Sequence, residues 1–191
     1  MAKVIFGMTM SLDGYVNDLN GSVGCLFSDF AAGNVQDESI QNNEVMQEAM
    51  RNTGSVVMGK NAFLMAGDLD SYADTYEFQV PIFVLTEEIP EKKPKENKNL
   101  NFTFITGGIG AAISQAKEAA GDKDVTIIGG ARTGQQALRA DLVDEIQIDI
   151  MPAIFGGGLR LFEDIGTEIE LEKVRVVEMS VRKHLKFRVL K

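Results

Sequence analysis

The order of its short apolar segments constrains this chain more than any other feature of the sequence. Runs rich in β-branched and aromatic residues alternate with segments whose apolar residues recur at helical spacing. Strands are predicted at residues 4–10, 55–59, 81–86, 101–106 and 124–128, and a long one begins at 143 and is stopped by Pro152 or shortly beyond. Helices are predicted at 40–52, 61–67, 108–121 and 131–142. Such alternation favours an α/β fold with a largely parallel sheet that is covered on both faces.

The pattern changes after Gly158. Residues 168–180 and 181–191 alternate apolar and polar side chains with a period of two, and the two segments are close enough in sequence to pair. The sequence therefore predicts a mostly parallel central sheet with a C-terminal antiparallel ribbon. A chain of 191 residues, 45% of them hydrophobic, can bury one sizeable core, so residues 1–191 are expected to form a single domain.

Composition narrows the range of functions. The formal net charge of -9 is expected to repel nucleic acid and anionic membranes, whereas a small anion can still bind where amides and cations gather. Cys25 is the only cysteine, so the chain can form neither an internal disulfide nor a thiolate zinc cluster. We expect a cytoplasmic protein with no metal site and no membrane helix. Its one histidine, His184, falls on the polar side of a predicted strand and is expected to face solvent.

Two predicted strands end in glycines that suit a phosphate group. Gly59 precedes Lys60 at the start of a helix, and Gly129 and Gly130 join a strand directly to a helix that carries Arg132 and Thr133. Free amides at a helix start, a nearby cation and the absence of a side chain all favour a bound diphosphate. The alternative is that these glycines serve a tight turn or close helix–strand packing, because their spacing is not G-x-G-x-x-G.

Two further segments follow predicted strands. Gly156, Gly157 and Gly158 form either a loop that lies against a ligand or a plain linker to the ribbon. Asp13 lies in an Asp-Gly turn after the first strand, where it could orient a substrate, relay a proton or simply form the turn.

Taken in order, the segments MTMSLDGYV, VVMGKNAF, TIIGGARTGQQAL and VDEIQIDIMPAIFGGGLRLFED span nearly the whole chain. Their order resembles that of the dihydrofolate reductase-like fold. It is most similar to the reductase domain of the bifunctional deaminase-reductase of riboflavin biosynthesis and its stand-alone relatives. The resemblance implies a three-layer fold and bound NADPH. The cofactor-binding positions that it implies are Gly59, Lys60, Thr86, Gly129, Gly130, Ala131, Arg132 and Thr133.

The resemblance also implies a substrate side, with Asp13 as the residue near the substrate and Gly156, Gly157 and Gly158 beside the nicotinamide or a substrate phosphate. Folate reductases keep a carboxylate in the first long helix, and the corresponding position here is Asn43, with Glu44 beside it. A neutral amide cannot pair with a charged pteridine, which argues against folate reduction. The chain also lacks the H-x-E and P-C-x-x-C motifs of the deaminase half.

The expected function is an NADPH-dependent reductase that transfers a hydride to a small pyrimidine or pteridine-like substrate, with a ribosyl-linked compound as one option. Two alternatives remain open: a dihydrofolate reductase, and a non-catalytic nucleotide- or pterin-binding module. By analogy with the riboflavin reductases, the chain is expected to form a homodimer.

Overall fold

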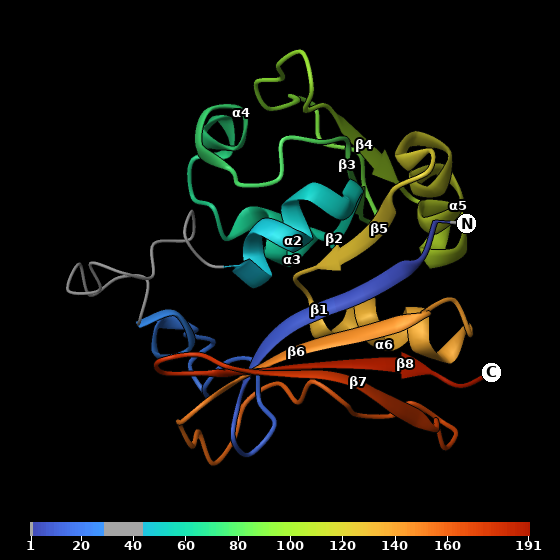
Figure 1. The fold of residues 1–191 in the computed structure, drawn as a ribbon. Helices are drawn as coiled ribbons and strands as arrows, with labels where there is room; N and C mark the ends of the chain where they lie inside the picture. The colour runs from blue at the N-terminus through green and yellow to red at the C-terminus, as the bar shows by residue number, and fades with distance from the viewer. Residues whose placement is uncertain (1, 29–43) are drawn as a thin grey trace.

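An eight-stranded sheet organises the computed structural model, which describes residues 2–28 and 44–191 (Figure 1). Its strand order is β4-β3-β2-β5-β1-β6-β8-β7. The strands are β1 (Val4–Ser11), β2 (Thr53–Gly59), β3 (Ile82–Leu85), β4 (Phe102–Ile105), β5 (Asp124–Ile128), β6 (Glu145–Met151), β7 (Leu171–Glu178) and β8 (Lys183–Val189). Neighbours from β4 to β6 are parallel, whereas β8 is antiparallel to both β6 and β7. The predicted parallel sheet with a C-terminal antiparallel ribbon is confirmed.

Helices form a layer on each face of the sheet (Figure 1). On one face, Val57 and Ile127 belong to an apolar cluster with α5 (Gly108–Ala120) and α6 (Ala131–Arg139). On the other face, the alternate residues Val56 and Met58 belong to a second cluster with side chains of α3 (Lys60–Leu64) and α4 (Tyr72–Thr75). Met46 and Ala49 attach α2 (Glu44–Asn52) to this second cluster. Two 3-10 turns, η1 (Gly24–Phe27) and η2 (Leu69–Ser71), complete the described elements. The predicted three-layer fold is therefore confirmed.

Helix α6 approaches the sheet closely because of one glycine. A Cβ atom on Gly134 would overlap the ring of Phe6, which is fully buried in the middle of the sheet. The helix therefore lies directly on β1, and its first turn stands at the carboxyl end of β5.

Two predicted helices end several residues earlier than expected. The helix predicted at 61–67 ends at Leu64, and the helix predicted at 131–142 ends at Arg139, just before Asp141 turns to a φ of 54°. The strand expected to be stopped by Pro152 or shortly beyond ends at Met151, because Pro152 has no amide hydrogen for the sheet.

The prediction that His184 faces solvent is wrong. Strand β8 lies between β6 and β7, and only 7% of the His184 surface is exposed. Its ring is hydrogen-bonded to Asp149, the residue directly opposite on β6. Alternation along the strand assigned His184 correctly to the polar side, but it could not show that this side is covered.

Candidate functional site

Five strand ends meet along one edge of the sheet. Because β1, β2, β3, β5 and β6 run parallel, the residues that follow them lie at the same carboxyl edge. The predicted positions at this edge are Thr86 after β3, Gly59 at the end of β2, Gly129 after β5, Asp13 after β1 and Gly156 after β6. In parallel α/β sheets this edge is where ligands bind.

The glycines of β2 and β5 lie against the start of α6. A Cβ atom on Gly59 would lie 2.6 Å from the Thr133 hydroxyl, and one on Gly130 would lie 3.1 Å from the same oxygen. Gly129 and Gly130 have φ values of 79° and 87°, which side chains rarely tolerate. Close packing between helix and strand, the alternative reading of these glycines, is therefore present. It is also what brings the start of α6 to the end of β2.

The first turn of α6 provides donors at this edge. Thr133 and Gly134 donate their amides to the Gly130 carbonyl, whereas the amides of Ala131 and Arg132 lie too early in the helix to have an intrahelical acceptor. The side chains of Arg132 and Lys60 are both exposed, and Lys60 is the first residue of α3, directly after Gly59. Amide donors and two cations thus border the glycines of β2 and β5, an arrangement that suits phosphate oxygens.

A hollow of about 380 Å³ opens beside Gly129. Its walls combine strand ends, α3 and the turn around α4, and the residues that line it are Met58, Ala62, Met65, Ala66, Ser71, Tyr72, Thr75, Tyr76, Glu77, Ile128 and Gly129. Most of these surfaces are apolar, as in sites that accept a flat organic ring. This wall could not be predicted from the sequence, because no periodic pattern marks residues 69–77.

Burial shifts the pKa values of the ionisable groups of the hollow. Burial raises the pKa of Glu77 and raises the pKa of Tyr72 to about 12. The Tyr76 hydroxyl is buried, and it has no hydrogen-bond partner within residues 2–28 and 44–191. The hollow therefore holds a carboxyl that keeps its proton to higher pH than usual, and the unpaired Tyr76 hydroxyl is buried in its wall.

Thr86 uses its side chain in a local turn. Its hydroxyl donates to the Glu88 carbonyl at 2.9 Å and accepts from the Glu88 amide at 3.3 Å. Thr86 therefore lies at the expected edge, and its hydroxyl shapes the turn there.

Asp13 joins the loop after β1 to the loop after β6. Its carboxylate accepts hydrogen bonds from the Ser11 hydroxyl at 2.6 Å and from the amides of Phe155 and Gly156 at 3.1 and 2.8 Å. These donors, the Ser11 hydroxyl first among them, lower the pKa of Asp13 to about 2. A carboxylate held in this way stays ionised near neutral pH, so Asp13 can position the loops but is poorly suited to relay a proton.

Two of the three consecutive glycines lie against the protein itself. A Cβ atom on Gly157 would come within 2.8 Å of the Leu19 side chain, and one on Gly158 would overlap the Asn17 carbonyl. Gly156 has open space around it. Only Gly156 is thus placed to lie beside a ligand. On the predicted substrate side, Glu44 is exposed at the start of α2, and Asn43 lies outside the described residues.

Neither a metal centre nor a membrane-spanning helix is found in the described part of the chain. Across residues 2–28 and 44–191, no three His, Cys, Asp or Glu side chains are grouped so that they could hold a metal ion. No helix in these ranges is both long enough and apolar enough to cross a bilayer.

Comparison with known proteins places the fold and the family. A putative riboflavin biosynthesis protein from Shewanella sp. is 22% identical, with a TM-score of 0.75 over 99% of each chain. A deaminase/5-amino-6-(5-phosphoribosylamino)uracil reductase from Thermotoga maritima is 14% identical, with a TM-score of 0.64 over 99% of this chain and 57% of that one. Dihydrofolate reductase from Enterococcus faecalis is 12% identical, with a TM-score of 0.61 over 99% of this chain and 97% of that one. Residues 2–185 match the family described as the RibD C-terminal domain. The chain therefore has a dihydrofolate reductase-like fold and belongs to the RibD C-terminal domain family.

Proposed function

We propose that the protein is an NADPH-dependent reductase that transfers a hydride to a small pyrimidine or pteridine-like compound. A ribosyl-linked compound is one option for this substrate. The observation that carries the proposal is the meeting of Gly59, Gly129 and Gly130 with the first turn of α6 at the carboxyl edge of the sheet. Family membership supports it, since one similar structure is named a uracil-compound reductase and another is a complex with NADP(H).

The residues at the edge fit a dinucleotide. The amides of Ala131 and Arg132 would hold the diphosphate, and the cations of Lys60 and Arg132 would balance its charge. When bound, the cofactor supplies the hydride. The protein's part is to hold the rings in the apolar hollow beside Gly129 and to exclude water from them.

Titration of the protein with NADPH, followed by calorimetry, tests the cofactor. We expect a dissociation constant on the order of micromolar for the wild type. Lys60→Ala and Arg132→Ala should each weaken binding about tenfold, because each removes one exposed charge near the phosphates. Lys117→Ala, on α5, is the control and should leave the affinity unchanged.

A second variant tests the backbone of the site. Gly130→Val places a side chain against Thr133 at a φ of 87°, so NADPH binding should be lost. Gly110→Ala, where a Cβ meets open space, is the matched control. Absence of NADPH binding to the folded wild type at millimolar concentration would refute the proposal.

Two other functions give different results in one assay of cofactor oxidation. A dihydrofolate reductase would consume NADPH with dihydrofolate. Of the two predicted pterin-side positions, Asn43 and Glu44, only Glu44 carries a carboxylate that could pair with the pterin, and its side chain is exposed. A binding module would bind NADPH and consume none with any ketone or imine in a substrate panel. Turnover with an aminopyrimidine compound and none with dihydrofolate is the expected outcome.

We further propose that two copies of the chain associate through β7. This strand is at the edge of the sheet and is exposed along nearly its whole length, with Leu171, Val174 and Val176 among its exposed side chains. An apolar edge strand with unpaired backbone groups favours association with another chain.

A further inference from the structure

The sheet face beneath α2 is polar where an interior strand would ordinarily be apolar. Strand β6 lies between β1 and β8, and its residues Glu145, Gln147 and Asp149 alternate with three isoleucines. The isoleucine side packs in the cluster of α5 and α6, whereas the polar side lies opposite. Strands of an α/β sheet that are covered on both faces are usually apolar on both. Polar residues retained there need a chemical reason.

One group on this face is an oriented histidine. His184 Nδ1 lies 2.8 Å from Asp149 Oδ1, and since a carboxylate can only accept, Nδ1 is the donor. The other oxygen, Asp149 Oδ2, lies 3.3 Å from Arg182 Nη1. Arg182 is 2% exposed and also donates to the Leu26 carbonyl at 3.1 Å, so its guanidinium holds the carboxylate in place. The imidazole is thus fixed with its Nε2 as the remaining hydrogen-bonding atom.

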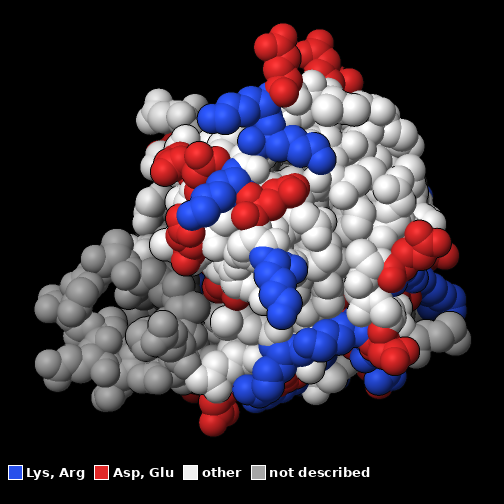
Figure 2. Space-filling view, turned by 90° about the horizontal axis from the view of Figure 1, so that it is seen from above, with Lys and Arg blue, Asp and Glu red and all other residues white. Residues whose placement is uncertain are grey.

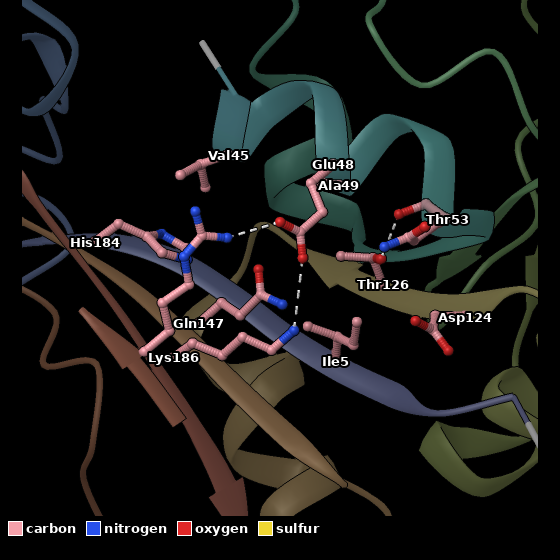
Figure 3. A pocket seen from close by; sticks show the side chains of 12 residues that line it. Ile5, Val45, Glu48, Ala49, Thr53, Asp124, Thr126, Gln147, His184 and Lys186 are labelled. Carbon is pink, nitrogen blue, oxygen red and sulfur yellow. Dashed lines mark hydrogen bonds and ion pairs between the residues drawn. The ribbon is translucent and has the colours of Figure 1, made fainter. Parts of the chain in front are cut away.

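His184 lines a chamber between α2 and the sheet (Figure 3). Figure 3 shows Val45 and His184 together at one end of this chamber, and Thr53 and Asp124 at the other. Thr53 and Asp124 begin β2 and β5, so the His184 end lies nearer the carboxyl edge of the sheet. The chamber measures about 40 Å³, which admits the edge of a small ring but not a whole ligand.

The histidine is also in line with the cofactor edge. Thr9 on β1 pairs in register with Asp149, and Asp149 pairs with His184. Gly7 pairs with Ile128 of β5, so Thr9 and Gly130 each lie two residues beyond that pair. Thr9, Asp149 and His184 therefore form a polar row across β1, β6 and β8, and β1 is the neighbour of the strand that ends at the glycine site.

We propose that His184, positioned by Asp149 and Arg182, contacts the substrate and selects a nitrogen heterocycle whose edge presents an N–H donor to Nε2. This inference rests on the proposed reductase function and adds the residue that recognises the far end of the substrate. Glu48, another residue of the chamber, is paired with Arg175 at 2.8 Å and with Lys186 at 4.0 Å. Within residues 2–28 and 44–191, the His184 ring makes one hydrogen bond, from Nδ1 to Asp149, so Nε2 is left for the ligand.

Nuclear magnetic resonance on the imidazole tests the contact directly, because His184 is the only histidine in the chain. The probe is 5,6-diaminouracil, titrated with and without saturating NADP⁺. We expect the probe to shift the Nε2 signal of the wild type while Nδ1 keeps its proton. Binding of the probe that leaves the His184 signals unmoved, or no binding of the probe, would overturn the proposal.

Two substitutions separate recognition from structure. A glutamine amide reaches the position of Nε2, whereas an asparagine amide reaches that of Nδ1. His184→Asn should therefore weaken probe binding about tenfold, the loss of one hydrogen bond, and His184→Gln should weaken it less. A purely structural histidine gives the opposite order, because asparagine preserves the contact with Asp149. Arg188→Gln, four residues further along β8 and on the same side of the strand, is the control.

Cofactor binding distinguishes a failure of the His184 proposal from a failure of the reductase proposal. NADPH should bind His184→Asn as tightly as the wild type, because the glycine site lies on other strands. Equal NADPH binding with the wrong order of probe affinities overturns only the role of His184. Failure of the wild type to bind NADPH overturns the reductase proposal, and the probe titration without cofactor still decides whether His184 is touched.

Discussion

At the scale of single residues, Asp13 and Glu77 are carboxyl groups with opposite surroundings. Asp13 is surrounded by donors that stabilise its charge, whereas Glu77 lies in an apolar hollow that disfavours charge. Their pKa values are therefore displaced in opposite directions from similar starting points. Of the two, Glu77 is the group that can carry a proton in the pH range where the other is fully ionised.

Asp13→Asn should make the protein less stable near neutral pH. In the folded state the pKa of Asp13 is lowered from 3.8 to about 2, so its contribution is present above pH 4 and is lost as pH falls toward 2. The variant should melt at a lower temperature than the wild type at pH 7, and the difference should shrink between pH 4 and pH 2. Thermal unfolding across that range measures it, with Asp122→Asn after α5 as the control.

Glu77→Gln should remove a loss of stability at high pH. Burial raises the pKa of Glu77 above its ordinary value of 4.5, so the folded state resists ionisation of this group. Stability is full at pH values below 4.5 and declines as pH rises through the raised pKa. Urea unfolding should show the variant gaining on the wild type as pH rises above 4.5. An unchanged difference across this range would contradict the assignment.

At the scale of elements, the strands and the alternation of strands with helices could be predicted from the sequence, because each strand is an apolar run between turn residues. The glycines at the ends of β2 and β5 could be predicted as a site because they stand between such a run and a helix. The wall of the hollow could not be, since Tyr72, Tyr76 and Glu77 come from a short irregular segment. Nor could the environment of His184, because alternation along β8 gives the side of the sheet but not what covers that side.

The packing of α6 on β1 depends on Gly134. Gly134→Ala puts a methyl group into the space of the Phe6 ring, so the helix must move outward. We expect a loss of about 1–3 kcal/mol in the free energy of unfolding, typical of an overpacked core, together with weaker NADPH binding. Gly110→Ala on α5 should instead stabilise by roughly 0.5–1 kcal/mol. Urea unfolding of the two variants gives the comparison.

At the scale of the whole molecule, the face drawn in Figure 2 carries no surface of a single charge. Figure 2 shows acidic and basic side chains intermixed on the face seen from above, beside a wide uncharged area. The net charge of -9 therefore says little about where a ligand binds. Two regions differ from the rest of the surface for other reasons. One is the carboxyl edge shared by the parallel strands, and the other is the exposed outer strand β7.

The exposed β7 edge should hold two copies of the chain together. Val174 and Val176 are each 46% exposed, and a lysine at either position would place a charge in the shared interface. The wild type is expected to scatter light as a dimer, and Val176→Lys as a monomer. Ile89→Lys, in an exposed loop between β3 and β4 and not on β7, should leave the dimer intact. A monomeric wild type at high concentration would count against the interface.

The two loops that Asp13 joins are also tied by their backbones. The Leu12 amide donates to Ala153, the Val16 amide to Leu159, and the Leu161 amide to Gly14. Gln135 of α6 fastens the second loop through the carbonyls of Arg160 and Leu161. The loops after β1 and β6 are therefore joined to each other and, through Gln135, to the helix that begins at the glycine site. A ligand that displaces one of these loops must also displace the other, and the displacement is passed on to α6.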